Sequence, residues 1–353
     1  MRTVNYVLAA LPPSPHTPEL LAPPYRPPAD LNYRRVGLAV GSMRRHITDE
    51  GWQLFQGLEC AGYELTGRCM GWGVDVPYIL TAARPDVIML QDKREWIGRT
   101  AGPGFDERER FVNVEALRDR HDVFKLTVLK DAQHDLAFHR ESAEEIGCHA
   151  WVTYYHPRIV KHLAPFVRER HLVRTFHSVD SNIVPPFRSS RIGVACLSGA
   201  VSGAYPLRTR LFEAARAGKL DTTAILQHPG YGRRQCFTPD YMEWLSYHKV
   251  AVCTSSVYGY ALRKIIEATA CGCSVLTDLP ADDCLPLIDA NLVRIDPDMP
   301  TPAVADLLDR MAMVWEPDRQ LELSLLANSW YDYRAAGSRL ADDIEDLRRE
   351  YVQ

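Results

Sequence analysis

The chain has 353 residues, of which 46% are hydrophobic and 24% are charged, so it is long enough for two domain cores. This composition excludes a disordered or collagen-like chain. A net charge of −4 excludes a strong overall attraction to nucleic acid or anionic membrane, although a local basic surface is compatible with it. The nine cysteines contain no C-x-x-C pair and several lie in apolar runs, which indicates core thiols in a reducing compartment. No apolar stretch approaches the ~18 residues of a membrane span, and we expect a cytoplasmic protein.

The first 34 residues are rich in proline, with eight prolines between positions 12 and 28. Proline lacks a backbone donor and fixes φ, so this segment cannot form a helix or a central strand. We therefore predict an extended N-terminal arm over residues 1–34.

Alternating strands and helices begin at residue 35 and continue to the end of the chain. Apolar runs predict strands at 36–40, 85–92, 123–131, 149–155 and 171–177, separated by helices at 49–62, 76–83 and 141–147. A second series predicts strands at 191–200, 222–230, 249–256, 273–278 and 292–296, with helices at 206–217, 241–248 and 262–271. Residues from 302 onwards are predicted to be helical, with an interruption near Pro317.

This pattern predicts an α/β protein with two Rossmann-like, doubly wound domains. We place the first domain at 35–185, the second at 186–325 and a closing helix at 326–353, with the boundary at Pro185 and Pro186. Ligands of such sheets bind outside the carboxyl ends of the strands. The loops that follow the strands are therefore where the chemistry is expected.

The segment 255–280 carries the most informative motif. Lys264, Glu267, Ala268, Ala270, Cys271 and Gly272 occur in order and are followed by the strand SVLTD. This segment resembles the donor-binding motif of GT-B glycosyltransferases. The resemblance implies two domains that face a cleft, a C-terminal helix that crosses back to the first domain, and sugar transfer from a nucleoside-diphosphate sugar.

Within this segment the resemblance implies a donor-binding role for Tyr260, Arg263, Lys264 and Glu267. A cation near a helix N-terminus favours a diphosphate, and a carboxylate one turn later can accept the hydroxyls of a ribose. Gly259 stands where many retaining members carry a first glutamate. The alternative is an ordinary Lys–Glu pair on a surface helix.

The segment 197–210 is a Gly/Ser-rich loop that opens a helix, and it contains Gly199, Arg208 and Arg210. Small residues permit close backbone approach, and arginine forks match phosphate oxygens. The resemblance implies that this loop faces the donor diphosphate, and that His228 and Tyr231, after the next strand, approach the nucleobase. A flexible loop with solvated arginines is the alternative.

In the first domain, Asp131 and His134 follow a predicted strand and are candidates for the general base that deprotonates an acceptor hydroxyl. We expect no metal site and no cofactor beyond the nucleotide-sugar co-substrate, most simply a UDP-sugar. Asp296 and Asp298 imitate a DxD metal motif, but their proline-rich setting indicates a turn. The protein's own cations, Lys264 with Arg208 or Arg210, would stabilise the leaving diphosphate.

The acceptor is open at this stage, with a small molecule or a glycan as the first expectation. A phage-type DNA glycosyltransferase acting on hydroxymethylated pyrimidine is an alternative, since paired arginines in the first domain could follow phosphates. A sugar-nucleotide epimerase on the same fold is another. A non-catalytic binding protein with two α/β lobes is the third.

Overall fold

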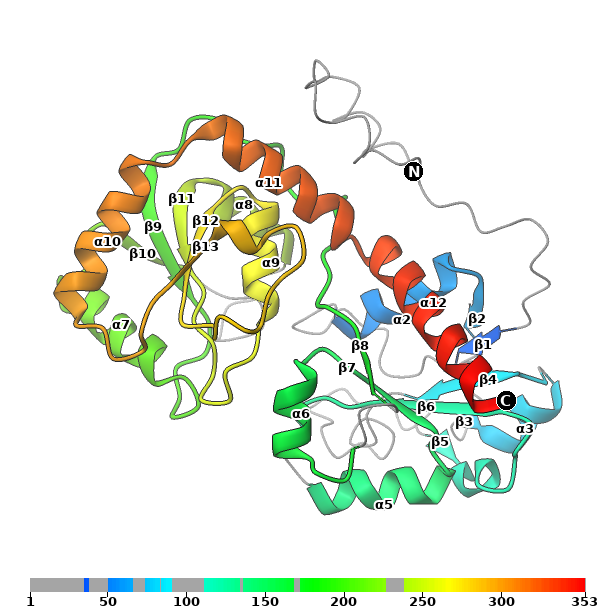
Figure 1. The fold of residues 1–353 in the computed structure, drawn as a ribbon. Helices are drawn as coiled ribbons and strands as arrows, with labels where there is room; N and C mark the ends of the chain where they lie inside the picture. The colour runs from blue at the N-terminus through cyan, green and yellow to red at the C-terminus, as the bar shows by residue number, and fades with distance from the viewer. Residues whose placement is uncertain are drawn as a thin grey trace. The chain divides into compact units, whose positions relative to one another are not determined.

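A computed structural model describes residues 35–37, 50–65, 74–82, 84–90, 111–133, 136–167, 172–226 and 238–352. The chain forms two compact units (Figure 1), one of which comprises the described residues of 177–332. The other contains the described residues up to Phe176 together with Tyr333–Val352. The predicted proline-rich arm lies outside the described residues.

The unit at 177–332 is built on one five-stranded parallel sheet. Its order is β10 (Thr223–Leu226), β9 (Gly193–Ser198), β11 (His248–Val252), β12 (Ser274–Thr277) and β13 (Leu292–Arg294). The first strand in the sequence, β9, therefore lies between β10 and β11, and all four pairings are parallel. The strand order changes direction at β9, which is the topological switch point of a doubly wound sheet.

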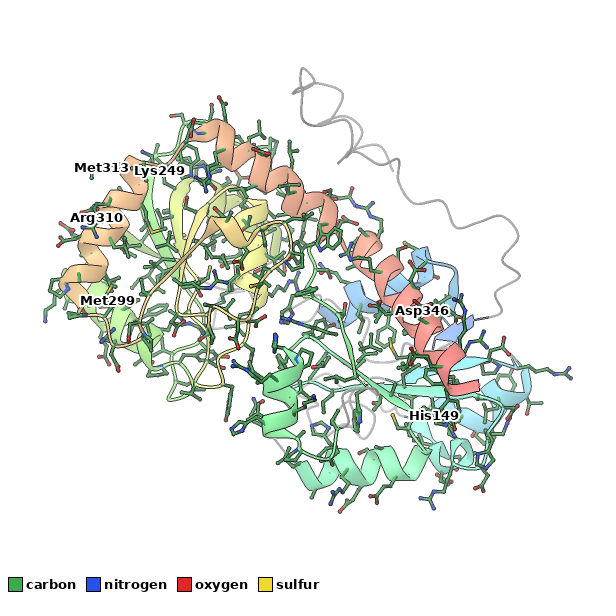
Figure 2. All side chains as sticks on the ribbon, in the orientation of Figure 1. His149, Lys249, Met299, Arg310, Met313 and Asp346 are labelled. Carbon is green, nitrogen blue, oxygen red and sulfur yellow. The ribbon has the colours of Figure 1, made fainter. Side chains whose placement is uncertain are left out.

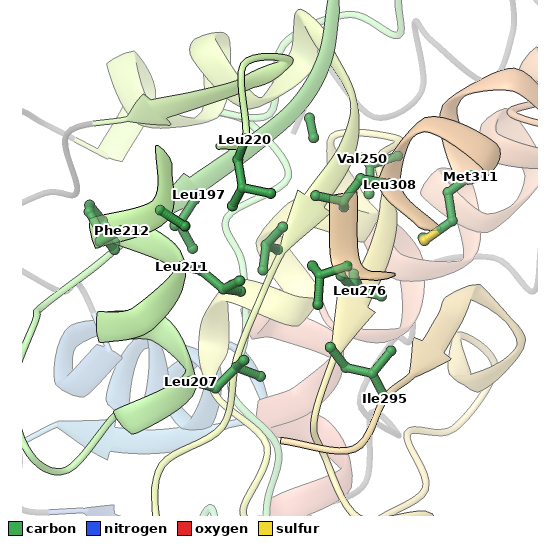
Figure 3. Close-up of a cluster of buried hydrophobic side chains, with 14 of the residues drawn as sticks. Leu197, Leu207, Leu211, Phe212, Leu220, Val250, Leu276, Ile295, Leu308 and Met311 are labelled. Carbon is green, nitrogen blue, oxygen red and sulfur yellow. The ribbon is translucent and has the colours of Figure 1, made fainter. Parts of the chain in front are cut away.

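Two helices cover one face of this sheet, α7 (Pro206–Arg216) and α10 (Thr301–Met313). Their apolar side chains form one core with the strands, which Figure 3 shows for Leu207 and Leu211 of α7, Leu308 of α10 and their neighbours. The other face carries α9 (Arg263–Ala270), against which α8 (Thr238–Ser246) and α11 (Pro317–Trp330) pack. A short 3-10 helix, η4 (Asp289–Asn291), precedes β13.

The second unit has a four-stranded parallel sheet in the order β4 (Val87–Leu90), β6 (Phe124–Val128), β7 (Ala150–Thr153) and β8 (Leu172–Arg174). Two short parallel pairs accompany it, namely β1 (Arg35–Gly37) with β2 (Tyr63–Leu65) and β3 (Val74–Asp75) with β5 (Phe111–Val112). Its helices are α2 (Glu50–Cys60), α3 (Val76–Ala82), η2 (Val114–Leu117), α5 (Leu136–Ile146), α6 (Pro157–Leu163) and α12 (Tyr333–Val352).

The C-terminal helix α12 belongs to this second unit and packs on α2. Gly57 of α2 and Gly337 of α12 face each other at the crossing, where a Cβ on Gly337 would lie 2.0 Å from the carbonyl carbon of Gly57. Two glycines therefore allow the helix backbones to touch. The predicted return of the closing helix to the first part of the chain is confirmed.

The α/β class with two parallel sheets is confirmed, and the predicted strands that fall on described residues are present in shortened form. The predicted start of the helix at 141 was wrong, because α5 begins at Leu136. Helix α6 was missed, since its seven residues are too few to show a period.

The helix predicted to run on from Pro317 was also wrong in extent, because α11 ends at Trp330. Tertiary hydrogen bonds hold the break: the Val179 N–H donates to the carbonyl of Tyr331, and Ser181 donates to the carboxylate of Asp332 through both its backbone N–H and its hydroxyl. The hydrophobic pattern of residues 317–353 cannot reveal these partners, because they lie far away in the sequence.

Candidate functional site

Two loops meet at the switch point of the sheet at 177–332. One follows β9 and spans 199–205, and the other follows β11 and spans 253–262. The N–H of Val257 donates to the carbonyl of Ala204 at 2.9 Å, which ties the two loops together. This is the edge of a doubly wound sheet where ligands bind.

Gly199 is the first residue after β9 and has a φ of 115°, a conformation that side-chain-bearing residues rarely adopt. A Cβ placed here would lie 1.7 Å from Nζ of Lys264 and 3.0 Å from Nη1 of Arg208. Both the backbone conformation and the two neighbouring cations therefore require glycine at this position.

Lys264 is the second residue of α9, and its side chain is 7% exposed. Its Nζ donates to the carbonyl of Ser198 at 2.8 Å, at the very end of β9. Burial, together with the nearby Arg208 charge, lowers the pKa of Lys264 to about 7. The side-chain amine of Lys264 is therefore only partly protonated at neutral pH.

Arg208, on α7, binds the ends of two strands at once. Its Nε donates to Oγ1 of Thr254 at 3.0 Å, its Nη2 to the carbonyl of Thr254 at 2.9 Å, and its Nη1 to the carbonyl of Ala200 at 3.2 Å. The guanidinium carbon lies 3.9 Å from the centre of the Tyr205 ring. The sequence did not single out Thr254, although the small polar run that begins there after β11 is the kind of strand end where such partners occur.

Arg263 and Glu267 form a buried ion pair one helical turn apart on α9, with 3.0 Å between Nε and Oε1. Their side chains are 9% and 5% exposed. The alternative of a solvated surface pair is therefore wrong for this helix. Arg208, Arg263 and Lys264 thus lie near the carboxylate of Glu267 in one buried group.

Tyr260 lies in the loop before α9, is buried, and stacks parallel to Tyr258 with 6.3 Å between ring centres. Gly259 between them has a φ of 65°, and a Cβ there would lie 3.2 Å from Cγ of Pro280. The loop therefore favours glycine where the resemblance would place a glutamate.

Arg210 does not join this group. Its Nη2 donates to the carbonyls of Pro297 and Met299, each at 2.8 Å, and Figure 2 labels Met299. Two residues along a helix turn the side chain by roughly 200°, so Arg208 and Arg210 leave opposite faces of α7. Of the two arginines offered by the sequence, Arg208 is therefore the one whose guanidinium lies beside Gly199 and Lys264.

Residues 296–298 form the predicted turn, in which the N–H of Asp298 donates to Oδ1 of Asp296 at 2.8 Å. The described residues contain no group of three or more His, Cys, Asp or Glu side chains able to hold a metal ion. The Sγ atoms of Cys271 and Cys273 donate to backbone carbonyls, and burial raises the pKa of Cys273 to about 11. Over the same part of the chain, no helix combines the length and the apolar character needed to cross a membrane.

In the other unit, Asp131 follows β6 with a φ of 46°. Its backbone N–H donates to the hydroxyl of Tyr155 at 3.0 Å, and that hydroxyl donates to Oδ1 of Asp131 at 2.9 Å. Tyr155 follows the adjacent strand β7 and was not expected from the sequence. His156 caps α6, since its Nδ1 accepts from the N–H of Arg158. The predicted residues His134, His228 and Tyr231 lie outside the described residues.

No protein-family model matches the chain, and no curated protein matches it. Solved structures do match. AviGT4, a glycosyltransferase involved in avilamycin A biosynthesis, is 13% identical with a TM-score of 0.51 over 90% of this chain and 98% of its own. Sucrose-phosphate synthase from Thermosynechococcus elongatus is 12% identical with a TM-score of 0.51 over 78% of this chain and 76% of its own.

HepE from Anabaena, solved in complex with UDP-glucose, is 11% identical with a TM-score of 0.50 over 76% of this chain and 81% of its own. At such low identity these matches establish the fold alone, and the chemistry has to be argued from the residues of the site. The chain therefore has the GT-B fold, the two-domain architecture of this group of glycosyltransferases.

Proposed function

We propose that this protein is a glycosyltransferase that transfers a sugar from a nucleoside-diphosphate sugar to a hydroxyl acceptor without a metal ion. One observation carries the proposal: Lys264 and Arg208, from two different helices, converge on Gly199 at the switch point of the sheet at 177–332. Two buried positive charges beside a glycine backbone are costly unless an anion neutralises them, so this arrangement favours anion binding.

The charge of this group fits a diphosphate. The phosphates of a nucleotide sugar carry two negative charges, and Arg208 and Lys264 bring two positive charges to Gly199 when Lys264 is protonated. The N-terminus of α9 adds the positive end of its helix dipole beside Lys264. As the sugar departs, the diphosphate gains further negative charge, which fixed cations in a buried site stabilise. The same chemistry would otherwise be supplied by a metal.

We propose a UDP-sugar as the donor. In support, HepE, which shares the fold, was solved with UDP-glucose. Glu267 would accept ribose hydroxyls and Tyr260 would line the same loop, while His228 and Tyr231 would contact the base.

For the acceptor, a small molecule or a glycan, we propose Asp131 as the general base, with His134 as the other candidate. The support for Asp131 is its left-handed backbone and the Tyr155 hydroxyl that holds its carboxylate, because strained backbone clusters at functional sites. Asp131→Asn should bind UDP-glucose as the wild type does and should lose transfer to a panel of hydroxyl acceptors, measured as UDP release. Unchanged transfer would remove Asp131 from the mechanism.

The test of the donor is a thermal-shift titration of the full chain with UDP, GDP, TDP, ADP and their glucose conjugates. A ligand at about 100 times its Kd stabilises the folded state by about 2.7 kcal/mol, which is readily seen as a higher Tm. We expect UDP and UDP-glucose to raise the Tm and free glucose, as the control, to leave it unchanged. If no nucleotide changed the Tm, the proposed function would be rejected.

A further inference from the structure

The ammonium of Lys264 is surrounded by groups from four elements. Arg208 of α7 approaches it across Gly199, and Glu267 lies one turn further along α9 itself. Its Nζ donates to the carbonyl of Ser198 at the end of β9. Cys253, which follows β11, donates its Sγ–H to the backbone carbonyl of Lys264. Burial raises the pKa of Cys253 to about 12, so this thiol is neutral at physiological pH.

Among the described residues, Arg191 adds one further charge at the C-terminal end of α9, where its Nη2 donates to the carbonyl of Cys271 at 2.7 Å. Tyr241 of α8 shares a hydrogen bond of 2.8 Å with the hydroxyl of Ser198, and burial keeps its pKa well above the ordinary tyrosine value. At the far end of α9, Ser324 and Asn328 of α11 donate to the carbonyl of Ala270. Among the described residues, Arg208 and Glu267 are the charged groups that act on the pKa of Lys264.

Without an anion, two effects disfavour the charged form of Lys264. Its side chain is buried, and the permanently charged Arg208 lies beside it, while Glu267 only partly opposes them and is itself paired with Arg263. A diphosphate at Gly199 would place two negative charges next to the same nitrogen. An opposite charge within a few ångströms favours the charged form, so the two events should assist each other.

We propose that donor binding is coupled to protonation: Lys264 takes up one proton when the diphosphate of a nucleotide sugar binds at Gly199, so that donor affinity falls as the pH rises above neutrality. The inference rests on the proposed function, since it requires a diphosphate at this site. The proton comes from solvent and converts the amine to an ammonium, and no bond of the donor is made or broken.

The direction of the pH dependence follows from the two states. Unliganded Lys264 has a pKa of about 7, and the bound diphosphate raises it. Below pH 7 the lysine is already charged, so donor binding takes up only a small fraction of a proton. Above pH 7, and below the pKa of the complex, each unit of pH lowers donor affinity by about tenfold.

Isothermal titration calorimetry with UDP-glucose tests this directly. The diphosphate of UDP-glucose is a diester whose acid groups do not titrate between pH 6 and 9, so a proton taken up at pH 7 belongs to the protein. Measured in buffers of different ionisation enthalpy, uptake should be near zero at pH 6, about half a proton at pH 7 and close to one at pH 8.5. Binding with no proton uptake at any of these pH values would overturn the inference while leaving the proposed function intact.

The matched control is Lys264→Arg, which keeps the charge and does not titrate in this range. We expect this variant to show neither proton uptake nor a decline of affinity with pH, and uptake that persisted in it would assign the proton to another group and overturn the inference. Should the larger guanidinium prevent folding, ¹³C-lysine NMR of the wild type gives the same answer. One lysine signal should titrate with a midpoint near pH 7, and this midpoint should rise above pH 9 when UDP-glucose is added. A spectrum with no such lysine signal would count against the inference. A wild type that bound neither UDP-glucose nor any other nucleotide of the thermal-shift panel would reject the proposed function instead.

Discussion

Lys264 and Arg208 donate to the two carbonyls that flank Gly199. Nζ of Lys264 binds the carbonyl of Ser198 at 2.8 Å, and Nη1 of Arg208 binds that of Ala200 at 3.2 Å. The two cations reach this turn from different helices, and they are 7% and 2% exposed. Bringing two like charges out of water beside each other costs free energy that a bound anion recovers. Substitutions at and around Gly199 should therefore change both donor binding and the free energy of unfolding.

Gly199→Ala should abolish donor binding. The added Cβ would lie 1.7 Å from Nζ of Lys264, and the φ of 115° is strained for alanine. We expect Lys264 to be displaced and the free energy of unfolding to fall by about 1–3 kcal/mol, the cost of a residue forced into such a backbone region. Calorimetry with UDP-glucose and urea denaturation measure the two effects.

Gly203→Ala is the matched control for this prediction. Gly203 lies in the same loop, and nothing is within 4 Å of the Cβ that it would acquire. It should bind UDP-glucose as the wild type does. Equal binding by the Gly199 and Gly203 variants would show that the turn at Gly199 takes no part in donor recognition.

Arg208→Gln and Arg210→Gln should differ sharply, although the residues are two apart on α7. Loss of Arg208 removes a cation from the proposed diphosphate site, and we expect UDP-glucose affinity to fall by about 10–100-fold, the worth of a charge-assisted contact. Arg210 donates to the carbonyls of Pro297 and Met299, so its loss should leave that affinity unchanged. Similar losses in both variants would contradict the assignment.

The sequence predicted the helix and the strand of segment 255–280 well because their signals are local. Helix α9 has residues of fixed order between two apolar strands, and the structure places Lys264 and Glu267 in the buried group that this order implies. Arg210 shows the limit: the sequence could not choose between Arg208 and Arg210, whereas the geometry of the helix places them on different faces of α7.

The partners that hold the site could not be predicted in the same way. Thr254 holds Arg208 across two strands, and Tyr155 holds Asp131 from a neighbouring strand end. Such contacts depend on strand order in the sheet, which a single sequence does not reveal. The break between α11 and α12 at Asp332 has the same origin, because its hydrogen-bond partner is Ser181.

Lys264→Met should lose donor binding and gain stability at neutral pH. The wild-type lysine has a pKa of 10.5 unfolded and about 7 folded, so between these values the unfolded state binds more protons and wild-type stability rises with pH. Methionine removes the buried charge, and we expect a gain of about 1–4 kcal/mol at pH 7 that shrinks as the pH approaches 10. Urea denaturation at pH 7 and pH 9.5 measures it. A variant less stable than the wild type at pH 7 would show that the Ser198 hydrogen bond outweighs the cost of burial.

Gly337→Ala tests the crossing of α12 and α2. Alanine favours a helix over glycine by about 1 kcal/mol, so an isolated helix would gain stability. Here the added Cβ would lie 2.0 Å from the carbonyl carbon of Gly57, and the backbones must separate. We expect the overpacking to outweigh the propensity and to lower the free energy of unfolding by about 1–3 kcal/mol in urea.

Asp346→Ala on the same helix is the control for this crossing. The Asp346 side chain is 72% exposed and pairs only with its helical neighbour Arg349 among the contacts that the structure describes for it; Figure 2 labels Asp346. Exposed pairs of this kind contribute little, so this variant should stay within about 0.5 kcal/mol of the wild type. If Gly337→Ala were as stable as Asp346→Ala, α12 would not be held on α2 by direct backbone contact. The return of the C-terminal helix to the first part of the chain would then depend on side-chain packing elsewhere along the two helices.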